Sequence, residues 1–331
     1  MGIKGLTQLI KKNSPDAIET TNLHKISGSK VAIDSSLFIY KMLTTIKMTS
    51  KDEEGNELKN VAHITGIFYK TINYLAVNIE PIYIFDGKPP DAKQEVIKGR
   101  KEKAQKSKEQ MLTAETKEQK DKLEKQSVRM TKEHIDDIKK LLDLMGVSYL
   151  HANGEAEAYA SELCRIGYVD YVVTEDMDTL AFGSPKMIRT NIDRKLKRPD
   201  LISIIDLNKI LESLKLSYEE FLDMCIMCGC DYCSNINRVG PAKSLSFIKE
   251  YKQIEQVLKN KKLEITEEYL QKVIKSRELF KMYHNNLKID ELDIHHSTMN
   301  TDSLEEYLVN ECRMNKSRVQ KAIKKTIDLY K

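Results

Sequence analysis

The chain has 331 residues, of which 40% are hydrophobic and 31% are charged, and its formal net charge is +4. This is the composition of a globular protein, and the length allows one large domain or two ordinary ones. No apolar run approaches the roughly 20 residues that span a bilayer, and residues 1–13 lack the apolar stretch of a signal peptide, so we expect an intracellular protein without a membrane partner.

The first half of the chain predicts strands that alternate with helices. Short apolar runs rich in β-branched and aromatic residues lie at 30–33, 81–85 and 168–173, as in strands buried on both faces of a parallel sheet. Apolar residues recur every three or four positions at 64–75 and at 138–145, where Gly146 is placed as a helix stop. We therefore expect an α/β protein whose mostly parallel central sheet is flanked by helices.

Residues 93–126 differ from their surroundings, because they are rich in Lys, Glu and Gln, contain no Pro and have almost no apolar stripe. The wider segment 88–132 has 14 basic and 8 acidic residues, so it carries +6 while the rest of the chain carries −2. We expect a helical insertion here. It is either a solvated pair of surface helices or an arch that becomes ordered over an acidic ligand.

After residue 203, apolar periodicity at 207–216 and 220–227 predicts a mainly helical region. We therefore divide the chain into an α/β core at 1–91 and 133–206, the insertion at 92–132 and a helical region at 207–331.

Carboxylates follow three of the predicted strands. Asp34 comes directly after one strand, Asp86 follows the next, and Asp176 and Asp178 come within a few residues of the third. A single Asp at such a position is usually a turn residue. Because ligand sites in open parallel sheets lie outside the carboxyl ends of the strands, the repetition predicts that these acids converge.

Glu155 and Glu157 lie where a loop enters a predicted helix. Residues two apart on a regular helix do not face each other, so both can point at one site only if Glu155 occupies the cap, which Gly154 permits. The alternative is that both acids only stabilise the positive end of the helix dipole, worth about 0.3–1 kcal/mol.

The density of carboxylates predicts divalent metal ions. Several buried carboxylates without cations would repel one another and take up protons. Ligands that are all oxygen favour Mg²⁺ or Mn²⁺ over zinc, and two such ions about 3.5–4 Å apart are the usual apparatus for phosphodiester hydrolysis. Nuclease activity is therefore the leading hypothesis from the residues alone.

Lys93 and Arg100 lie seven residues apart on the basic insertion, close to two helical turns, and so share one face. Two cations on one face can reach the same phosphate, with Arg as the bidentate partner and Lys as a point charge. The alternative is that they are ordinary members of a basic surface.

Six short motifs, in this order and spacing, resemble the flap endonuclease branch of the structure-specific 5′ nucleases. They are MGIKGL at 1–6, VAIDS at 31–35, FDGKPP at 85–90, GEAEA at 154–158, TEDMD at 174–178 and GCDYC at 229–233. The resemblance extends from residue 1 to about residue 325, and FDGKPP favours the flap endonucleases over their exonuclease and Holliday-junction-cutting relatives.

The resemblance implies a fold with a PIN-like nuclease core, a helical arch through which a 5′ flap threads, and a helix-two-turn-helix in the C-terminal helical region. The implied activity is a Mg²⁺-dependent 5′ flap endonuclease with 5′→3′ exonuclease activity, acting in DNA replication and repair in the nucleus. The ligands implied for one Mg²⁺ are Asp34, Asp86, Glu155 and Glu157, and those for the other are Asp176, Asp178 and Asp231. Lys93 and Arg100 are the catalytic residues implied for the scissile phosphate.

The resemblance also implies DNA-binding residues. Tyr40 corresponds to a residue that stacks on a base near the cut, which would be sequence-tolerant and worth about 1–3 kcal/mol. Gly2 corresponds to a processed N-terminus near the active site. Lys47 stands where an Arg is usual in the family.

VGPAKS at 239–244 resembles the family's helix-two-turn-helix, where backbone N–H groups grip duplex phosphates. Gly240 and Lys243 are the expected DNA contacts. Arg238 replaces the first glycine of the usual Gly-x-Gly. Because a non-Gly residue tolerates positive φ poorly, this replacement puts in doubt both the shape of the hairpin and the binding of the K⁺ ion often found there. Arg238 can instead contact a phosphate directly.

The family's sliding-clamp motif is incomplete here. Gln320 and Ile323 begin its spacing, but Thr326 and Ile327 occupy its aromatic positions. We therefore expect no clamp binding by this route, and branched DNA as the partner of a monomer.

Alternative hypotheses remain open at the level of sequence. Four cysteines, Cys225, Cys228, Cys230 and Cys233, have zinc-like spacing, although buried packing of thiols is the commoner outcome. The alternatives for function are a non-catalytic DNA-binding protein of the same fold, a broader 5′→3′ exonuclease and a Mg²⁺-dependent phosphatase.

Overall fold

The computed structural model describes residues 2–46, 59–189, 201–261 and 266–327. At the centre of this part of the chain is a seven-stranded sheet in the order β1-β7-β6-β5-β2-β3-β4. The strands are β1 Ile18–Asn22, β2 Lys30–Asp34, β3 Glu80–Phe85, β4 Tyr149–His151, β5 Tyr171–Val173, β6 Lys186–Arg189 and β7 Leu201–Asp206. Four neighbouring pairs are parallel, and β7 pairs antiparallel with β1 and β6. The predicted mostly parallel α/β sheet is therefore confirmed.

The predicted strands agree with β2 and β3, but the third is shorter than expected. The backbone N–H groups of Tyr168 and Val169 both donate to the Leu163 carbonyl, so these two residues belong to the turn that precedes β5. The other four strands were not predicted. The last of them, β7, ends at residue 206, where the helical region was expected to begin.

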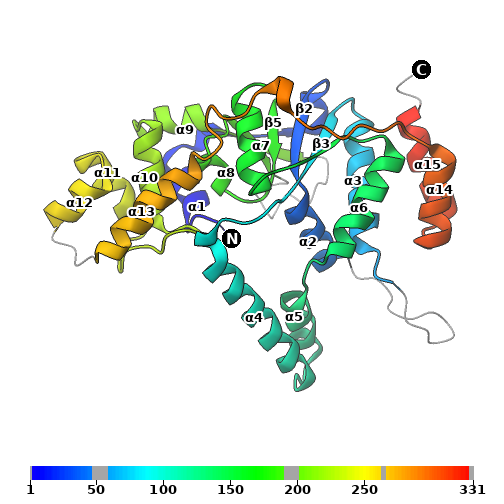
Figure 1. Cartoon of the computed structure of the whole chain (residues 1–331), viewed down its shortest axis with the longest axis horizontal. Helices are drawn as coiled ribbons and strands as arrows, with labels where there is room; N and C mark the ends of the chain where they lie inside the picture. The colour runs from blue at the N-terminus through cyan, green and yellow to red at the C-terminus, as the bar shows by residue number, and fades with distance from the viewer. Residues whose placement is uncertain (1, 47–58, 190–200, 262–265, 328–331) are drawn as a thin grey trace.

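Alternation along the strands divides the core into two apolar layers. Val31 and Ile33 of β2 pack on one face of the sheet, whereas Ala32 packs on the other. The first face is covered by α3 Ala62–Leu75 and α6 Lys132–Met145, on which α14 Thr301–Glu306 and α15 Lys316–Ile327 pack in turn (Figure 1). The second is covered by α1 Leu6–Asn13, α7 Ala156–Arg165, α8 Asp178–Ala181, α9 Leu207–Leu214 and α10 Tyr218–Cys228.

Two helices of the first face were predicted, and for α6 the end was predicted as well. The residues of α3 and α6 that recur every three or four positions are buried, and Gly146 ends α6 with a left-handed φ of 66°. Between β2 and α3, α2 Ser35–Thr45 continues directly from the strand.

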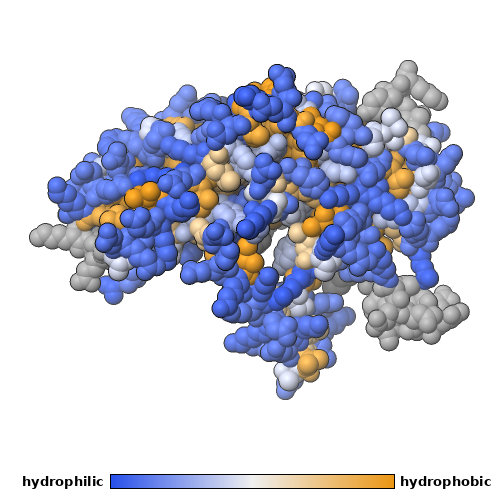
Figure 2. All heavy atoms as spheres, viewed as in Figure 1, coloured by the Kyte–Doolittle hydropathy of each residue, from blue (hydrophilic) through white to orange (hydrophobic). Residues whose placement is uncertain are grey.

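The basic insertion forms two helices that project away from the sheet (Figure 1). A short turn of 3₁₀ helix, Asp91–Lys93, leads into α4 Gln94–Leu112, and α5 Lys117–Ser127 returns. The two pack on each other at Ala104 and Ser107, which are buried, and the surface of the pair is largely hydrophilic (Figure 2). Leu112, at the turn between them, is 84% exposed. The insertion is therefore an arch with little attachment to the core beyond its base.

The helical region continues with α11 Pro241–Tyr251, α12 Ile254–Lys261 and α13 Glu267–Phe280. Residues 281–300, here called the strap, then cross the edge strand β4, where Tyr149 and His295 exchange backbone hydrogen bonds of 3.2 and 2.9 Å. The strap ends at α14, which a π-helical turn, Tyr307–Glu311, joins to α15. Among the described residues, no helix combines the length and apolar character needed to cross a membrane.

Candidate active site

Two acids fix the start of the site to the ends of neighbouring parallel strands. Asp34 ends β2 and caps α2, since its Oδ1 accepts the Leu37 N–H at 3.1 Å. Asp86 follows β3, and its Oδ1 accepts the Ala156 N–H at 2.8 Å, which ties the end of β3 to the start of α7. The strand-end positions expected from the sequence are therefore confirmed for this pair.

Glu155 and Glu157 take the arrangement expected of a cap and a first turn. Glu155 is the extended N-cap residue of α7, with φ −78° and ψ 129°, and Glu157 lies in the first helical turn. Glu157 accepts hydrogen bonds from the backbone N–H of Thr179, at 3.1 Å, and from its hydroxyl. Because Thr179 is the neighbour of Asp178, the carboxylates of α7 and α8 lie side by side.

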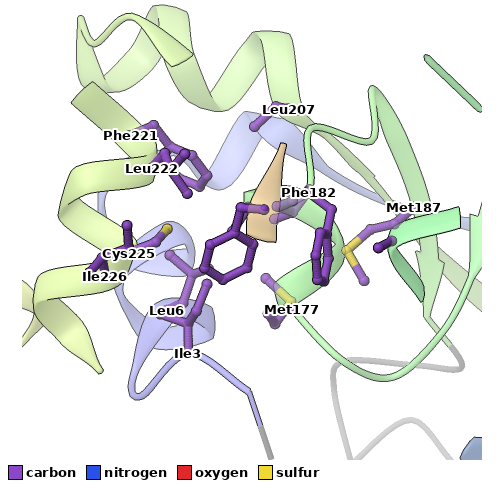
Figure 3. Packing of buried hydrophobic residues seen from close by; sticks show 14 of the residues in the cluster. Ile3, Leu6, Met177, Phe182, Met187, Leu207, Phe221, Leu222, Cys225 and Ile226 are labelled. Atoms are coloured by element: carbon purple, nitrogen blue, oxygen red, sulfur yellow. The ribbon is translucent and has the colours of Figure 1, made fainter. Parts of the chain in front are cut away.

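The N-terminal segment completes the surroundings of Asp176 and Asp178. The Ile3 N–H donates to Asp178 Oδ1 at 2.6 Å, and Ile3 and Leu6 are inserted in the apolar core beside α10 (Figure 3). Gly2 has a φ of 84°, and a Cβ on it would lie 1.8 Å from Asp176 Oδ1. Only glycine fits this position, so the expected closeness of Gly2 to the active site is a property of the fold.

Asp231 meets the base of the arch. Arg100 donates to Asp231 Oδ2 at 2.7 Å, Lys93 Nζ lies 3.5 Å from the same oxygen, and Lys93 also forms an ion pair with Glu155. Burial opposes the charge of Lys93, but Glu155 and Asp231 outweigh it and raise the lysine pKa. The two arch cations therefore face the acid cluster together, on the shared face that their spacing predicted.

Asp34, Glu157 and Asp178 have raised pKa values. Burial, and then the charge of Asp86, raise the pKa of Asp34 to about 7. Burial and the charge of Asp176 raise the pKa values of Glu157 and Asp178 well above the usual range of a carboxyl. Acids from distant parts of the chain thus share one low-dielectric site.

The donor set fits divalent metal ions. Seven carboxylates supply only oxygen ligands, and the raised pKa values show that the cluster needs positive charge to ionise fully. Within the described ranges, no three His, Cys, Asp or Glu side chains are already gathered around one point as metal ligands. Lys93 and Arg100 instead form ion pairs with Glu155 and Asp231.

The four cysteines behave as packing residues. Cys225 and Cys228 end the buried helix α10, as expected, and Cys233 is also buried. Within the described part of the chain these thiols do not gather with other ligands into a group of three or more that could hold a metal ion, so the zinc-like spacing does not form a zinc site.

Arg238 and Lys243, two of the expected DNA contacts, have exposed side chains. Tyr40 is half-buried on α2, and Lys47 lies outside the described residues. Arg238 adopts a left-handed φ of 61°, and Lys243 Nζ donates to its carbonyl at 3.1 Å, so the hairpin accommodates the replaced glycine. Gly240 caps α11, with Pro241 as the first helical residue.

Two groups near the acids were not singled out from the sequence. Tyr232 donates its hydroxyl hydrogen bond to Glu155, and Glu175 forms ion pairs with Lys41 at 2.7 Å and with Arg189 at 3.5 Å. In the sequence, only the position of Tyr232 next to Asp231 indicated that this tyrosine lies near the site. Its partner, 77 residues away, could not be found without the fold.

Comparisons with known proteins agree with this geometry. Residues 1–107 match the family model of the XPG N-terminal domain and residues 146–231 that of the XPG I-region. Flap endonuclease 1 of Glycine max is 38% identical over 98% of this chain and 86% of its own length.

Solved structures give the same result. The flap endonuclease-1 structure from Methanococcus jannaschii is 26% identical, with a TM-score of 0.69 over 94% of this chain and 96% of that one. The catalytic core of Rad2 in complex with DNA substrate, 20% identical, shares the fold with a TM-score of 0.70 over 97% and 99% of the two chains. With these motifs, this sheet and this full-length similarity, the chain belongs to the flap endonuclease family of structure-specific, divalent-metal-dependent nucleases.

Proposed function

We propose that this chain is a 5′ flap endonuclease that hydrolyses a phosphodiester at the base of a 5′ flap during DNA replication and repair, with 5′→3′ exonuclease activity as well. The observation that carries the proposal is the convergence of acids from β2, β3, α7, α8 and the end of α10 beneath Lys93 and Arg100 of the arch. A DNA-binding protein without catalysis would have no need of this arrangement.

The proposed ligands divide into two groups. Asp34, Asp86, Glu155 and Glu157 hold one Mg²⁺, and Asp176, Asp178 and Asp231 hold the other, with Mn²⁺ as a substitute. When bound, such a pair of ions lowers the pKa of the attacking water and neutralises charge on the leaving side. Support comes from the all-oxygen donor set and from the shared, raised pKa values of its buried members.

Lys93 and Arg100 are the proposed catalytic cations on the scissile phosphate. They form ion pairs with Glu155 and Asp231, so they lie beside the position that a phosphate above those acids would take. Arg can hold two phosphate oxygens at once, whereas Lys supplies a point charge. The arch that carries them is the proposed passage for the flap.

The duplex is held by other residues. We propose Tyr40 as a stacking surface, Gly2 as a contact near the cut, and Lys47 and Arg238 as phosphate partners. The start of α11, at Gly240 and Lys243, presents backbone N–H groups and a cation to the duplex backbone. K⁺ at the hairpin before α11 is a further proposal, and binding assays with K⁺ or Na⁺ test it.

We propose that the protein acts as a monomer in the nucleus, on branched DNA, without a sliding clamp bound through residues 320–327. Ile323 is buried in the first apolar layer, and Gln320 donates to Glu305 at 2.9 Å, so these residues serve the fold.

The test is incubation with a flapped duplex labelled at its 5′ end, with Mg²⁺ or with EDTA, beside single-stranded and blunt controls. We expect one product cut near the flap base, only with Mg²⁺ and only from the branched substrate. Binding without cutting would favour the non-catalytic alternative. The length of the released products separates flap cutting from exonuclease work.

A further inference from the structure

Tyr232 makes a contact that the metal and phosphate assignments leave unexplained. The residue is 8% exposed, and its hydroxyl donates a hydrogen bond to Glu155 Oε2. Its ring packs edge-to-face against Phe280 of α13, with centroids 5.1 Å apart and planes inclined by 69°. The hydroxyl is therefore aimed at the carboxylate by a fixed ring.

Glu155 is held at both of its carboxylate oxygens. Oε2 faces the Tyr232 hydroxyl, and Oε1 faces the ammonium group of Lys93 at the base of the arch. The residue is 6% exposed, so water cannot replace a lost partner easily. With Tyr232 on Oε2, the oxygen left to face the arch side of the site is Oε1.

The backbone around Tyr232 is fixed to the rest of the site. The Lys4 N–H donates to the Gly229 carbonyl at 3.2 Å, and the Cys230 N–H donates to the Cys233 carbonyl at 2.9 Å, which closes a turn around residues 231 and 232. Consecutive residues of this turn thus act on different acids, since Asp231 receives Arg100 while Tyr232 holds Glu155.

We propose that Tyr232 is a positioning residue that orients the Glu155 carboxylate for metal binding and has no contact with DNA. The inference rests on the proposed assignment of Glu155 as a metal ligand. A hydrogen bond to one oxygen restricts rotation of the carboxylate and directs the other oxygen at the ion. Loss of such an outer partner typically costs about 10–100-fold in metal affinity or activity.

The test is Tyr232→Phe, which keeps the ring against Phe280 and removes only the hydroxyl. Mn²⁺ binding to the DNA-free protein is measured by titration calorimetry, and kcat and KM are measured on the flapped duplex at several Mg²⁺ concentrations. We expect about 10–100-fold weaker Mn²⁺ binding at one site, a lower kcat that recovers as Mg²⁺ is raised, and an unchanged KM for DNA.

Tyr83→Phe is the matched control. It removes another buried hydroxyl, bonded to Thr71 at 2.7 Å in the opposite apolar layer, and should leave Mn²⁺ binding and the Mg²⁺ dependence as in the wild type. If Tyr232→Phe also behaves like the wild type in both measurements, or only lowers the melting temperature, the positioning role is overturned.

Glu155→Gln separates the inference from the function on which it rests. If Glu155→Gln weakens Mn²⁺ binding, the metal assignment stands, and Tyr232→Phe should add little in the Glu155→Gln background, because both changes act on one carboxylate. Fully additive effects would show that Tyr232 acts independently of Glu155. Unchanged Mn²⁺ binding in Glu155→Gln would remove the metal assignment itself.

Discussion

The carboxylate of Asp178 has two roles: it accepts a structural hydrogen bond, and it belongs to the acid cluster. Its Oδ1 accepts the Ile3 N–H, and the same group is surrounded by the charges of Asp176 and Asp231. A substitution at this residue can therefore affect the N-terminal segment as well as the chemistry. A useful variant has to keep the hydrogen bond to Ile3 while removing the negative charge.

Asp178→Asn meets that requirement, because the amide oxygen still accepts the Ile3 N–H while the charge is lost. We expect cleavage of the flapped duplex to fall by more than about 100-fold, beyond the usual effect of losing an outer partner of a metal ligand. Binding measured by fluorescence anisotropy in EDTA should be largely retained. Asp206→Asn, which alters the cap of α9 far from the cluster, is the control and should cleave normally. Normal cleavage by Asp178→Asn would contradict the metal assignment.

His63 links stability to pH. It is fully buried on α3, with Nε2 3.0 Å from Asp137 Oδ2, and burial lowers its pKa to about 4 in spite of that carboxylate, while His134 and Lys59 lower it further. Between pH 6.5 and 4 the unfolded chain, with a His pKa near 6.5, binds a proton at this residue, whereas the folded chain does not. The stabilisation is therefore complete above pH 6.5 and is lost as the pH falls towards 4.

We expect the free energy of unfolding to decrease by up to about 3 kcal/mol from this group between those pH values. Urea unfolding at pH 7 and at pH 5, where about 2 kcal/mol of this decrease is expected, measures the change. His63→Gln removes the titrating group and should reduce the difference between the two conditions. An equal difference in wild type and variant would show that other groups cause it.

At the scale of elements, the cations of the arch and the proposed metal ions compete for the same acids. Lys93 and Arg100 neutralise Glu155 and Asp231, which are also proposed metal ligands. Metal binding and the position of the arch are therefore linked, and by reciprocity each weakens or strengthens the other by the same factor.

Arg100→Ala is expected to tighten Mn²⁺ binding to the DNA-free protein several-fold, because a competitor for Asp231 is removed, and to slow cleavage, because a phosphate partner is lost. Titration calorimetry and single-turnover cleavage measure the two effects. Lys108→Ala, exposed further along α4, is the control and should change neither strongly. Weaker Mn²⁺ binding in Arg100→Ala would mean that Arg100 supports the site in some other way.

The elements also show where prediction from sequence stops. The strands β2 and β3 were found because both faces of each are buried, which makes their runs continuously apolar. The strands β4 and β6 have three and four residues, and β1 is IETTN, so neither length nor hydropathy marks them.

The same limit holds for the site. Six of the acids could be predicted from strand ends and a helix start, which are local signals, whereas Asp231 was assigned only through the family resemblance. The contacts of Tyr232 with Glu155 and of Ile3 with Asp178 join residues 77 and 175 positions apart, and only the packing of α10 and the N-terminal segment brings them together.

At the scale of the whole molecule, charge is concentrated on one projection. The arch segment 88–132 carries +6 in a chain whose remainder carries −2. Electrostatic attraction to DNA should therefore come mainly from the arch and should release counterions when phosphates are bound.

We expect binding to the flapped duplex to weaken steeply between low and moderate salt. Replacing Lys103 and Lys106 by Gln should reduce the slope of log affinity against log salt by up to about 1 for each lysine. Lys324→Gln with Lys325→Gln on α15 removes the same charge far from the arch and serves as the control. Equal slopes for the two double variants would show that the arch does not grip phosphates.

The strap and the helices that follow it are synthesised last, after all the acids of the site. All seven acids have been made by residue 231, yet the apolar layer that contains Val31 and Ile33 is complete only when the strap has crossed β4 and delivered Leu304, Leu308 and Val319, because α14 packs on α6 and α15 on α3. A nascent chain can therefore hold its reactive acids while apolar faces of α3 and α6 are still exposed and prone to aggregation. Burial of those faces awaits the last helices, so the enzyme should become protease-resistant only after almost the whole chain has left the ribosome.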